Sequence, residues 1–327
     1  MIRTAWVAFV VFLYLIFVGV PLLLYSVLCG QTDALYRAGR WGCRLALRLA
    51  GVKLEIRGTE RIPAGRAVVF MANHQSMCDP PALISVLPPV RVLLKKSLFG
   101  IPILGAGMKL RGFIPVDRQN REQAMHAVEA AVAALKNGHS FLIYPEGTRS
   151  PDGRLLPFKK GAFIMALKAQ APIVPISVSG ASRIMRKSEI AIRPGPVRIT
   201  IHDPISTEGY SLEDRGIVME LVRMTIISGL SEDEWPHALA LGAKPARAMH
   251  GVASGGRHEV ALAHGFVRAD VDGEFILYEH PQRGILHTFR DGTWRHVAPD
   301  GRETSGTGAE ELAQHLRKQS TNVIKPN

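Results

Sequence analysis

The chain has 327 residues, with 40 lysines and arginines against 28 aspartates and glutamates, a formal net charge of +12. This excess predicts an anionic partner: nucleic acid, a membrane surface or a phosphorylated substrate. Its three cysteines are too few and too widely spaced for a disulfide scaffold or a structural zinc site, which indicates a reducing compartment.

The basic excess is confined to the first three quarters of the chain. From Arg247 onward ten basic residues balance ten acidic ones, so the whole excess lies in residues 1–246, together with the apolar segments. This distribution favours a membrane and its phosphates. No zinc-finger, RNP or heptad signature supports a nucleic-acid partner, and we expect none.

Residues 1–50 predict a membrane anchor. Between Arg3 and Asp33 no charged residue occurs, and the apolar run is longer than the roughly 20 residues that cross a bilayer. Its length and the lack of a clear cleavage site argue against a signal peptide. Gly19 and Pro21 interrupt the run, so a kinked span and a re-entrant helical hairpin are both open.

A basic segment follows the apolar run. Its arginines recur every three or four residues, which predicts a helix lying on an anionic leaflet, with an ordinary solvated helix face as the alternative. By the positive-inside rule they place the rest of the chain on the cytoplasmic side of the inner membrane. These arginines are Arg37, Arg40, Arg44 and Arg48.

Residues 51–230 alternate between strand and helix patterns. Residues 121–136 have a helical apolar stripe and 161–169 also indicate a helix, whereas 52–58 alternate with period two. This order predicts an α/β domain: a mixed, largely parallel central sheet with flanking helices. The other predicted strands are apolar runs at 67–72, 91–94, 112–116, 140–145 and 172–178, and an alternating segment at 197–201.

Residues 231–327 read as a linker followed by a small β-meander, near 250–318. Short alternating segments are separated by Asp-Gly turns at Asp272, Asp291 and Asp300, and a short helix is predicted at 310–318. Seven of the twelve histidines lie in this unit or at its entrance. Their spacing matches no metal motif, so we expect no metal and assign the unit no function.

The candidate chemistry begins at "NHQSMCDPP". His74 directly follows a buried strand, where open α/β sheets place their ligands. Asp79 precedes two prolines, which push it out of helical geometry and predict it as the N-cap of a helix whose first residue is Pro80. A histidine with a carboxylate that fixes its tautomer suits a general base. A Cys78–His74 nucleophilic pair is a disfavoured rival.

Basic and glycine-containing insertions follow three later strands. Arginine binds phosphate oxygens bidentately, lysine supplies a point charge, and glycine lets the backbone approach a ligand. Each insertion alone is weak, but their order, each at a strand end, is strong evidence for an anion site. They carry Lys95 and Lys96, then Arg118, and then Glu146, Gly147, Thr148 and Arg149.

Four ordered blocks, "NHQSMCD", "GFIPVDR", "YPEGTRS" and "APIVPISV", resemble the glycerophospholipid acyltransferases, above all the bacterial-type lysophosphatidate (1-acyl-sn-glycerol-3-phosphate) acyltransferases. The resemblance covers about residues 52–201. One departure is Pro115, where the family usually has an aromatic or aliphatic residue, which puts the shape of the acceptor pocket in question.

The resemblance implies a membrane enzyme that acylates the free hydroxyl of lysophosphatidate to phosphatidate, using acyl-CoA or acyl-carrier protein as co-substrate and no cofactor. His74 would take the hydroxyl proton, with Asp79 orienting it. Arg118, Arg149 and the Lys95/Lys96 pair would hold the phosphate, and Glu146 and Gly147 would line the acceptor site. Two alternatives are another lysolipid acceptor, such as lyso-ornithine lipid or a lysophospholipid, and a non-catalytic lipid-binding adaptor.

Overall fold

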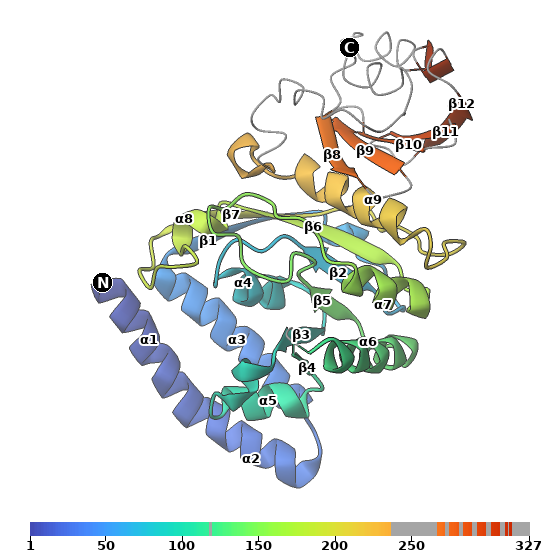
Figure 1. Ribbon diagram of the computed structural model, residues 1–327. Coiled ribbons are helices and arrows are strands. Elements are labelled where there is room, and N and C mark those ends of the chain that lie inside the picture. The colour runs from blue at the N-terminus through green and yellow to red at the C-terminus, as the bar shows by residue number, and fades with distance from the viewer. Residues whose placement is uncertain are drawn as a thin grey trace. The chain divides into compact units, whose positions relative to one another are not determined.

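A computed structural model describes most of the chain. The described residues are 1–117, 120–236, 267–271, 275–280, 284–289, 293–298, 302–307, 311–312 and 314–315. The chain divides into two compact units, Met1–Val222 and Arg223–Asn327. Figure 1 shows the elements of each.

The first unit is built on a seven-stranded sheet in the order β1-β7-β6-β2-β5-β3-β4. Strands β2 to β6 are parallel to their neighbours among themselves, whereas β7 is antiparallel to β6 and carries β1 parallel to itself. The predicted mixed, largely parallel sheet is therefore confirmed. The strands are β1 Val52–Arg57, β2 Val69–Ala72, β3 Arg91–Lys95, β4 Ile114–Val116, β5 Phe141–Ile143, β6 Ile173–Ser179 and β7 Gly195–Ile201.

The three central strands explain the continuous apolar runs of the sequence. All residues of β2, β5 and β6 are buried, and Phe70, Phe141 and Ile173 are fully excluded from solvent. The helices are α1 Ile2–Tyr14, α2 Val20–Cys29, α3 Asp33–Ala50, α4 Asp79–Val86, α5 Leu104–Leu110, α6 Arg121–Lys136, α7 Gly161–Ala169, α8 Ala181–Ile184 and α9 Arg215–Ser228. Short helical turns lie at Leu15–Gly19, Thr59–Arg61, Lys96–Gly100 and Glu232–Glu234.

The connections between the strands create a topological switch point at one end of this sheet. The chain leaves β2 toward β3 through α4, but leaves β5 toward β6 through α7, in the opposite direction along the sheet. Right-handed crossovers put those two helices on opposite faces. In agreement, α4 packs with α3, and α7 packs with α6 (Figure 1). The carboxyl ends of β2 and β5 thus meet at a topological switch point, where such sheets bind ligands.

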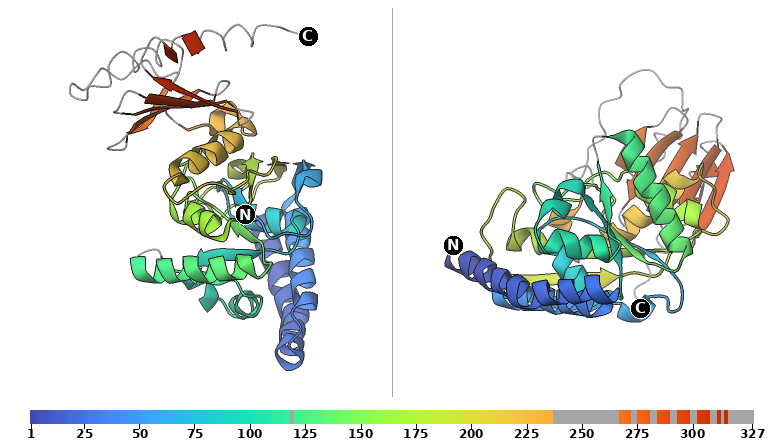
Figure 2. Two further views of the ribbon diagram at one scale, coloured as in Figure 1. Left: turned by 90° about the vertical axis from the view of Figure 1, so that its right-hand side faces the viewer. Right: turned by 90° about the horizontal axis from the view of Figure 1, so that it is seen from below.

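The apolar N-terminus forms one continuous helical run, Ile2–Cys29, long and apolar enough to cross a membrane. A π-helical turn, Leu15–Gly19, lies just before Pro21, which lacks the N–H that a regular helix needs. The chain reverses after Gly30, and α3 returns alongside α1 and α2 (Figure 2). A helical hairpin exists, but its turn follows residue 29 and its second arm is the basic helix.

Two of the arginines expected on a lipid surface bind protein instead. Arg40 donates to the carbonyl oxygens of Ile84 and Ser85 at 3.1 and 3.3 Å. Arg44 donates to the Ser85 carbonyl through Nε and Nη2, at 3.2 and 2.8 Å. They satisfy carbonyls at the end of α4 that have no partner within that helix. Arg37 and Arg48 are exposed.

The second unit contains a five-stranded antiparallel sheet, β8 Val267–Val271, β9 Phe275–His280, β10 Gly284–Phe289, β11 Thr293–Val297 and β12 Glu303–Thr307. The meander is confirmed, with β8 and β12 added to the three predicted segments. Leu286 and Trp294 are buried in it. The three predicted Asp-Gly turns lie outside the described residues, and so does most of the predicted helix 310–318.

Candidate active site

His74 directly follows β2, and hydrogen bonds fix both its own backbone and the side chain of the preceding residue, Asn73. The Asn73 amide bonds both the N–H and the C=O of Val178 in β6, at 2.7 and 2.8 Å. His74 itself donates its N–H to Glu146 Oε1 at 2.6 Å and accepts at its carbonyl from the Ser150 N–H at 2.7 Å. The histidine backbone is therefore fixed to the segment that follows β5.

The predicted His74–Asp79 contact is present. His74 Nδ1 lies 2.8 Å from Asp79 Oδ2, and the aspartate is fully buried. The same oxygen accepts from the N–H groups of Gln75 and Ser76, both at 2.7 Å. Since an ionised carboxylate only accepts, Nδ1 carries the proton and Nε2 is left as the basic nitrogen.

The prediction that Asp79 caps the following helix from outside is wrong. Asp79 is the first residue of α4, with Cys78 at the N-cap position and no capping side-chain bond there. Its Oδ2 bonds the turn that precedes it, and its Oδ1 is buried with no hydrogen-bond partner among the described residues. The prolines do start the helix, but the carboxylate organises the turn between His74 and α4.

Tyr144 completes the surroundings of the imidazole. Its ring stacks on His74 with centroids 4.1 Å apart and an interplanar angle of 22°. Burial, and then the nearby Asp79 and Cys78, raise the pKa of Tyr144 well above its ordinary value. Its hydroxyl is therefore neutral, and within the described part of the chain it has no hydrogen-bond partner. Sequence reasoning missed this residue, because its sequence context marks it only as the end of a strand.

Glu146 connects the two loops that form the site. It is 2% exposed, and its oxygens accept from the N–H groups of His74 and Leu156, the latter at 2.9 Å. These are charge-assisted bonds to backbone donors, which are stronger than neutral ones. Glu146 therefore positions the backbone of His74. The family resemblance implied only that Glu146 lines the acceptor site.

The Gly147–Arg149 turn brings cations next to the histidine loop. Gly147 has a φ of +69°, which favours glycine, and the Lys159 side chain crosses the turn where a Cβ would lie 2.8 Å from its Cδ. Lys187 Nζ donates to Thr148 Oγ1 at 3.2 Å. Arg149 has no ion pair with a carboxylate of the described residues. The turn thus carries uncompensated positive charge suited to a phosphate.

Lys159 and Lys187 were also missed by sequence reasoning. Lys187 is 39 residues from Thr148 along the chain, so no local pattern could have paired them. Lys95 and Lys96, which were predicted, end β3 and begin the next turn, and both are exposed.

The remaining predicted phosphate ligand is Arg118. Arg118 lies outside the described residues, just after β4. Pro115 occupies that short edge strand and is exposed, a position that tolerates proline because it needs no ladder donor.

Cys78 is not available as a nucleophile. It is 9% exposed, and burial together with the Asp79 charge raises its thiol pKa to about 12. The thiolate, which is the reactive form, is therefore scarce at neutral pH. No three His, Cys, Asp or Glu side chains gather for a metal ion within the ranges that the structure describes.

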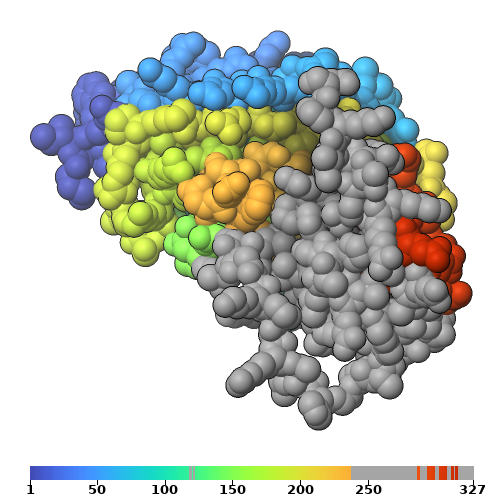
Figure 3. Space-filling view, turned by 90° about the horizontal axis from the view of Figure 1, so that it is seen from above, coloured from blue at the N-terminus to red at the C-terminus, as the bar shows by residue number. Residues whose placement is uncertain are grey.

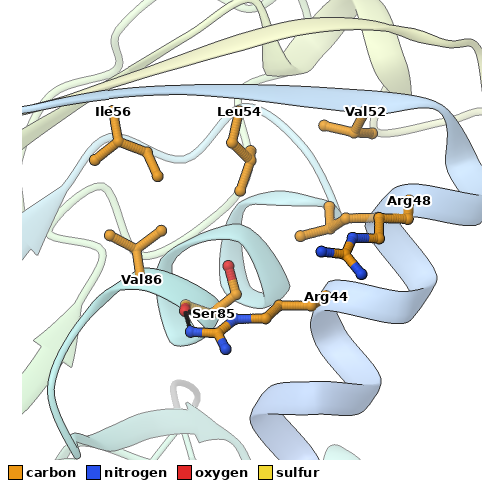
Figure 4. A pocket seen from close by; sticks show the side chains of 8 residues that line it. Arg44, Arg48, Val52, Leu54, Ile56, Ser85 and Val86 are labelled. Atoms are coloured by element: carbon orange, nitrogen blue, oxygen red, sulfur yellow. Dashed lines mark hydrogen bonds between the residues drawn. The ribbon is translucent and has the colours of Figure 1, made fainter.

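A separate groove of about 410 Å³ lies beside α3 and the edge strand β1. Figure 4 shows apolar side chains of Val52, Leu54 and Ile56 on one wall and Arg44 bonded to Ser85 below them. None of the predicted site residues lines this groove.

Comparison with known proteins places this geometry in a family. The acyltransferase family profile matches residues 53–179, the segment that holds His74, Asp79 and the Gly147–Arg149 turn. The 1-acyl-sn-glycerol-3-phosphate acyltransferase alpha of Mus musculus is 34% identical over 191 residues, which are 57% of this chain and 67% of that protein. The chain belongs to the acyltransferase family.

Other acyltransferases support the assignment over different lengths. The chloroplastic 1-acyl-sn-glycerol-3-phosphate acyltransferase BAT2 of Brassica napus is 39% identical over 155 residues, 47% of this chain. The chain spans only 45% of the length of that relative. The crystal structure of the 1-acyl-sn-glycerophosphate (LPA) acyltransferase PlsC from Thermotoga maritima superposes with a TM-score of 0.62 and 28% identity, covering 69% of this chain and 92% of that one.

Proposed function

We propose that this protein transfers an acyl chain from a thioester donor, acyl-CoA or acyl-carrier protein, to the free hydroxyl of 1-acyl-sn-glycerol-3-phosphate, giving phosphatidate. The observation that carries the proposal is the joining of two half-sites. The His74–Asp79 pair and the cationic Gly147–Arg149 turn follow neighbouring strands and are bonded to each other through Glu146 and Ser150. Relatives named for this reaction support the choice of acceptor.

The reaction needs a base and no covalent enzyme intermediate. His74 Nε2 takes the proton of the acceptor hydroxyl, whose oxygen forms a bond to the thioester carbonyl carbon. The C–S bond then breaks, and the leaving thiolate takes the proton back from the imidazolium. Asp79 stabilises that imidazolium through the 2.8 Å contact at Nδ1. Thiolate is a good leaving group, because thiols have a pKa of about 8.5.

The cations would hold the acceptor phosphate. In this proposal Arg149, with Arg118 and the Lys95/Lys96 pair, binds the phosphate oxygens, and Lys159 and Lys187 add charge at the turn. Thr148 and Gly147 would line the same site. Glu146 would border the acceptor while it holds the two loops. No cofactor other than the thioester co-substrate is part of the proposal.

The N-terminal helix would keep the enzyme at the membrane that supplies its lipid. This 28-residue helix is attached to the catalytic unit near its start, where Thr4 accepts from the Ile192 N–H, and along its second half, where α2 packs against α5. Just beyond its end, Arg111 bonds Thr32 and Asp33. A helix held in this way lies along the unit, which favours burial in the lipid–water interface. The catalytic unit would face the cytoplasm at the inner membrane.

The test is an acyl-transfer assay on the full chain in vesicles. Lysophosphatidate, a zwitterionic lysophospholipid and lyso-ornithine lipid are offered with acyl-CoA or acyl-carrier protein. We expect phosphatidate as the main product, and His74→Ala to lower its rate by about 10²–10⁴-fold. His126→Ala, at an exposed position of α6, is the matched control.

Three results would overturn the proposal. A preference for another lysolipid would contradict the acceptor. The absence of transfer to any acceptor would favour the lipid-binding adaptor. A fully active His74→Ala protein would contradict the general base.

A further inference from the structure

The segment between α8 and β7, residues 185–194, is here named the bridging loop. At its first end it contacts both halves of the candidate site. The Met185 carbonyl accepts from Ser76 Oγ at 2.7 Å, next to the His74–Asp79 turn. Lys187 Nζ reaches Thr148 of the cationic turn. The bridging loop thus forms one border of the site.

At its other end the bridging loop contacts the first turn of the apolar helix. The Ile192 N–H donates to Thr4 Oγ1 at 3.0 Å. Arg3 and Pro194 both lie close to Gly51: a Cβ atom added to this glycine would be 2.5 Å from Arg3 Nη1 and 2.8 Å from Pro194 Cβ. Figure 3 shows the dark blue N-terminus beside the yellow-green surface that contains this segment. One ten-residue segment therefore links the start of the apolar helix to the site.

The exposed tip of the bridging loop combines an apolar side chain with basic ones. Ile190 is 74% exposed, among the most exposed large apolar residues of the described chain. Three basic residues and one acidic residue leave the bridging loop with a charge of +2. Glu189 pairs with both Arg186 and Arg193, so Lys187 is the cation that no carboxylate of the described residues neutralises.

The neighbouring surface has the same character. Met1 and Ile2, at the start of the helix that Thr4 ties to the bridging loop, are 82% and 89% exposed. A single exposed apolar side chain needs no explanation. An apolar side chain flanked by cations, in a loop that is hydrogen-bonded to an exposed apolar helix end, fits a lipid–water interface, where apolar groups enter the acyl region and cations meet phosphates.

We propose that the bridging loop docks on an anionic lipid bilayer, with Ile190 entering the interface, and so holds the border of the site against the leaflet. This inference rests on the proposed function in that the leaflet supplies the lysolipid acceptor. The lipid would then pass from the leaflet to the site beside Lys187 without entering bulk water. Capture of the acceptor would depend on lipid presentation, whereas the chemical step would not.

The first experiment separates capture from chemistry. Full-length protein and its Ile190→Ser variant are compared on long-chain lysophosphatidate in vesicles that contain phosphatidylglycerol, and on a short-chain lysophosphatidate that is monomeric in solution. We expect Ile190→Ser to lower the vesicle rate by about three- to tenfold, from losing part of the burial of one isoleucine. The rate on the soluble acceptor should not change. Met125→Ser, on α6 at 43% exposure, is the matched control and should alter neither rate.

The second experiment needs no activity, so it separates failure of this inference from failure of the proposed function. Ile190→Trp and Met125→Trp are placed in phosphatidylglycerol vesicles with brominated acyl chains. The quenching of the added tryptophan is taken as the difference from wild type, which has four of its own. We expect clear quenching at position 190 and little at 125. Equal quenching at both, or equal loss of both rates in Ile190→Ser, would overturn the inference.

Discussion

The stacking of Tyr144 on His74 leads to a prediction about the transition state. In the proposed mechanism the imidazole becomes a cation when it takes the hydroxyl proton. A cation over an aromatic face is stabilised by about 0.5–2 kcal/mol, the upper part applying to desolvated pairs. The ring contact itself contributes about 0.5–1.5 kcal/mol and fixes the plane in which Nε2 points. The ring contact is present before the proton moves, so only the cation–ring term and the loss of ring orientation act on the transition state. We expect these to cost about 1–2 kcal/mol when the ring is removed.

Two substitutions separate the ring from the hydroxyl. Tyr144→Leu should lower kcat by about 5- to 30-fold with little change in KM, since 1.36 kcal/mol corresponds to tenfold in rate. Tyr144→Phe should keep nearly full activity, because the hydroxyl that it removes is buried without a partner among the described residues. Removing such a group can even stabilise the fold.

The assay is steady-state acyl transfer with lysophosphatidate in vesicles, accompanied by thermal unfolding of each variant. An equal loss in both variants would refute the reasoning, because the hydroxyl and not the ring would then be the active part. A fully active Tyr144→Leu protein would refute it from the other side.

Two further predictions concern buried titratable groups. Glu146→Gln places an N–H₂ group where the backbone donors of His74 and Leu156 need acceptors. We therefore expect a destabilisation of about 1–3 kcal/mol, seen as a lower melting temperature, together with a lower kcat. A rise in KM alone would show that Glu146 contacts the acceptor and does not position His74. His202, bonded to Ser177 and buried, has its pKa lowered to about 4 by burial and then by Arg61, so the folded protein keeps it neutral while the unfolded chain takes up a proton below about pH 6.5. The free energy of unfolding should therefore decrease by up to ~3 kcal/mol as the pH falls from about 6.5 toward 4. Measured by denaturant unfolding, the decrease should be smaller in His202→Gln than in wild type. An identical pH dependence of the two proteins would contradict this assignment.

The elements that sequence predicted best are those whose signal is local. The buried strands β2, β5 and β6 are continuous apolar runs, and the helix predicted at 121–136 agrees with α6, where Asn120 accepts from the Gln123 N–H as an N-cap. The His74–Asp79 contact spans only five residues, so the strand end and the nearby carboxylate were enough to predict it, although the prolines misled the placement of Asp79 relative to α4.

Contacts between segments that are distant in the sequence could not be predicted from local sequence patterns. Arg40 and Arg44 have the spacing of a membrane-surface helix, yet α4 ends against α3 and offers unpaired carbonyls, which bind both side chains. Lys187 lies in a segment with no regular periodicity, and only the return of that segment from α8 to β7 brings it to Thr148. The Asp79 error has a similar cause: an aspartate before prolines can bond forward or backward, and the folded turn decides.

The two loops of the candidate site are joined by hydrogen bonds, which explains why the proposed base and the proposed phosphate-binding turn need not share a sequence motif. The neighbouring strands β2 and β5 are in parallel register, so the segments that follow them start side by side. Two bonds then join them, His74 N–H to Glu146 and Ser150 N–H to the His74 carbonyl, and a third, from the Leu156 N–H to Glu146, fixes Glu146 within its own loop. Because Glu146 is buried, these bonds compete little with water, and a shift of either loop would break more than one of them. The distance between His74 and the cations of the Gly147–Arg149 turn is thus set by the pairing of two strands. In the proposed function, this fixed span would position one lipid hydroxyl relative to its own phosphate.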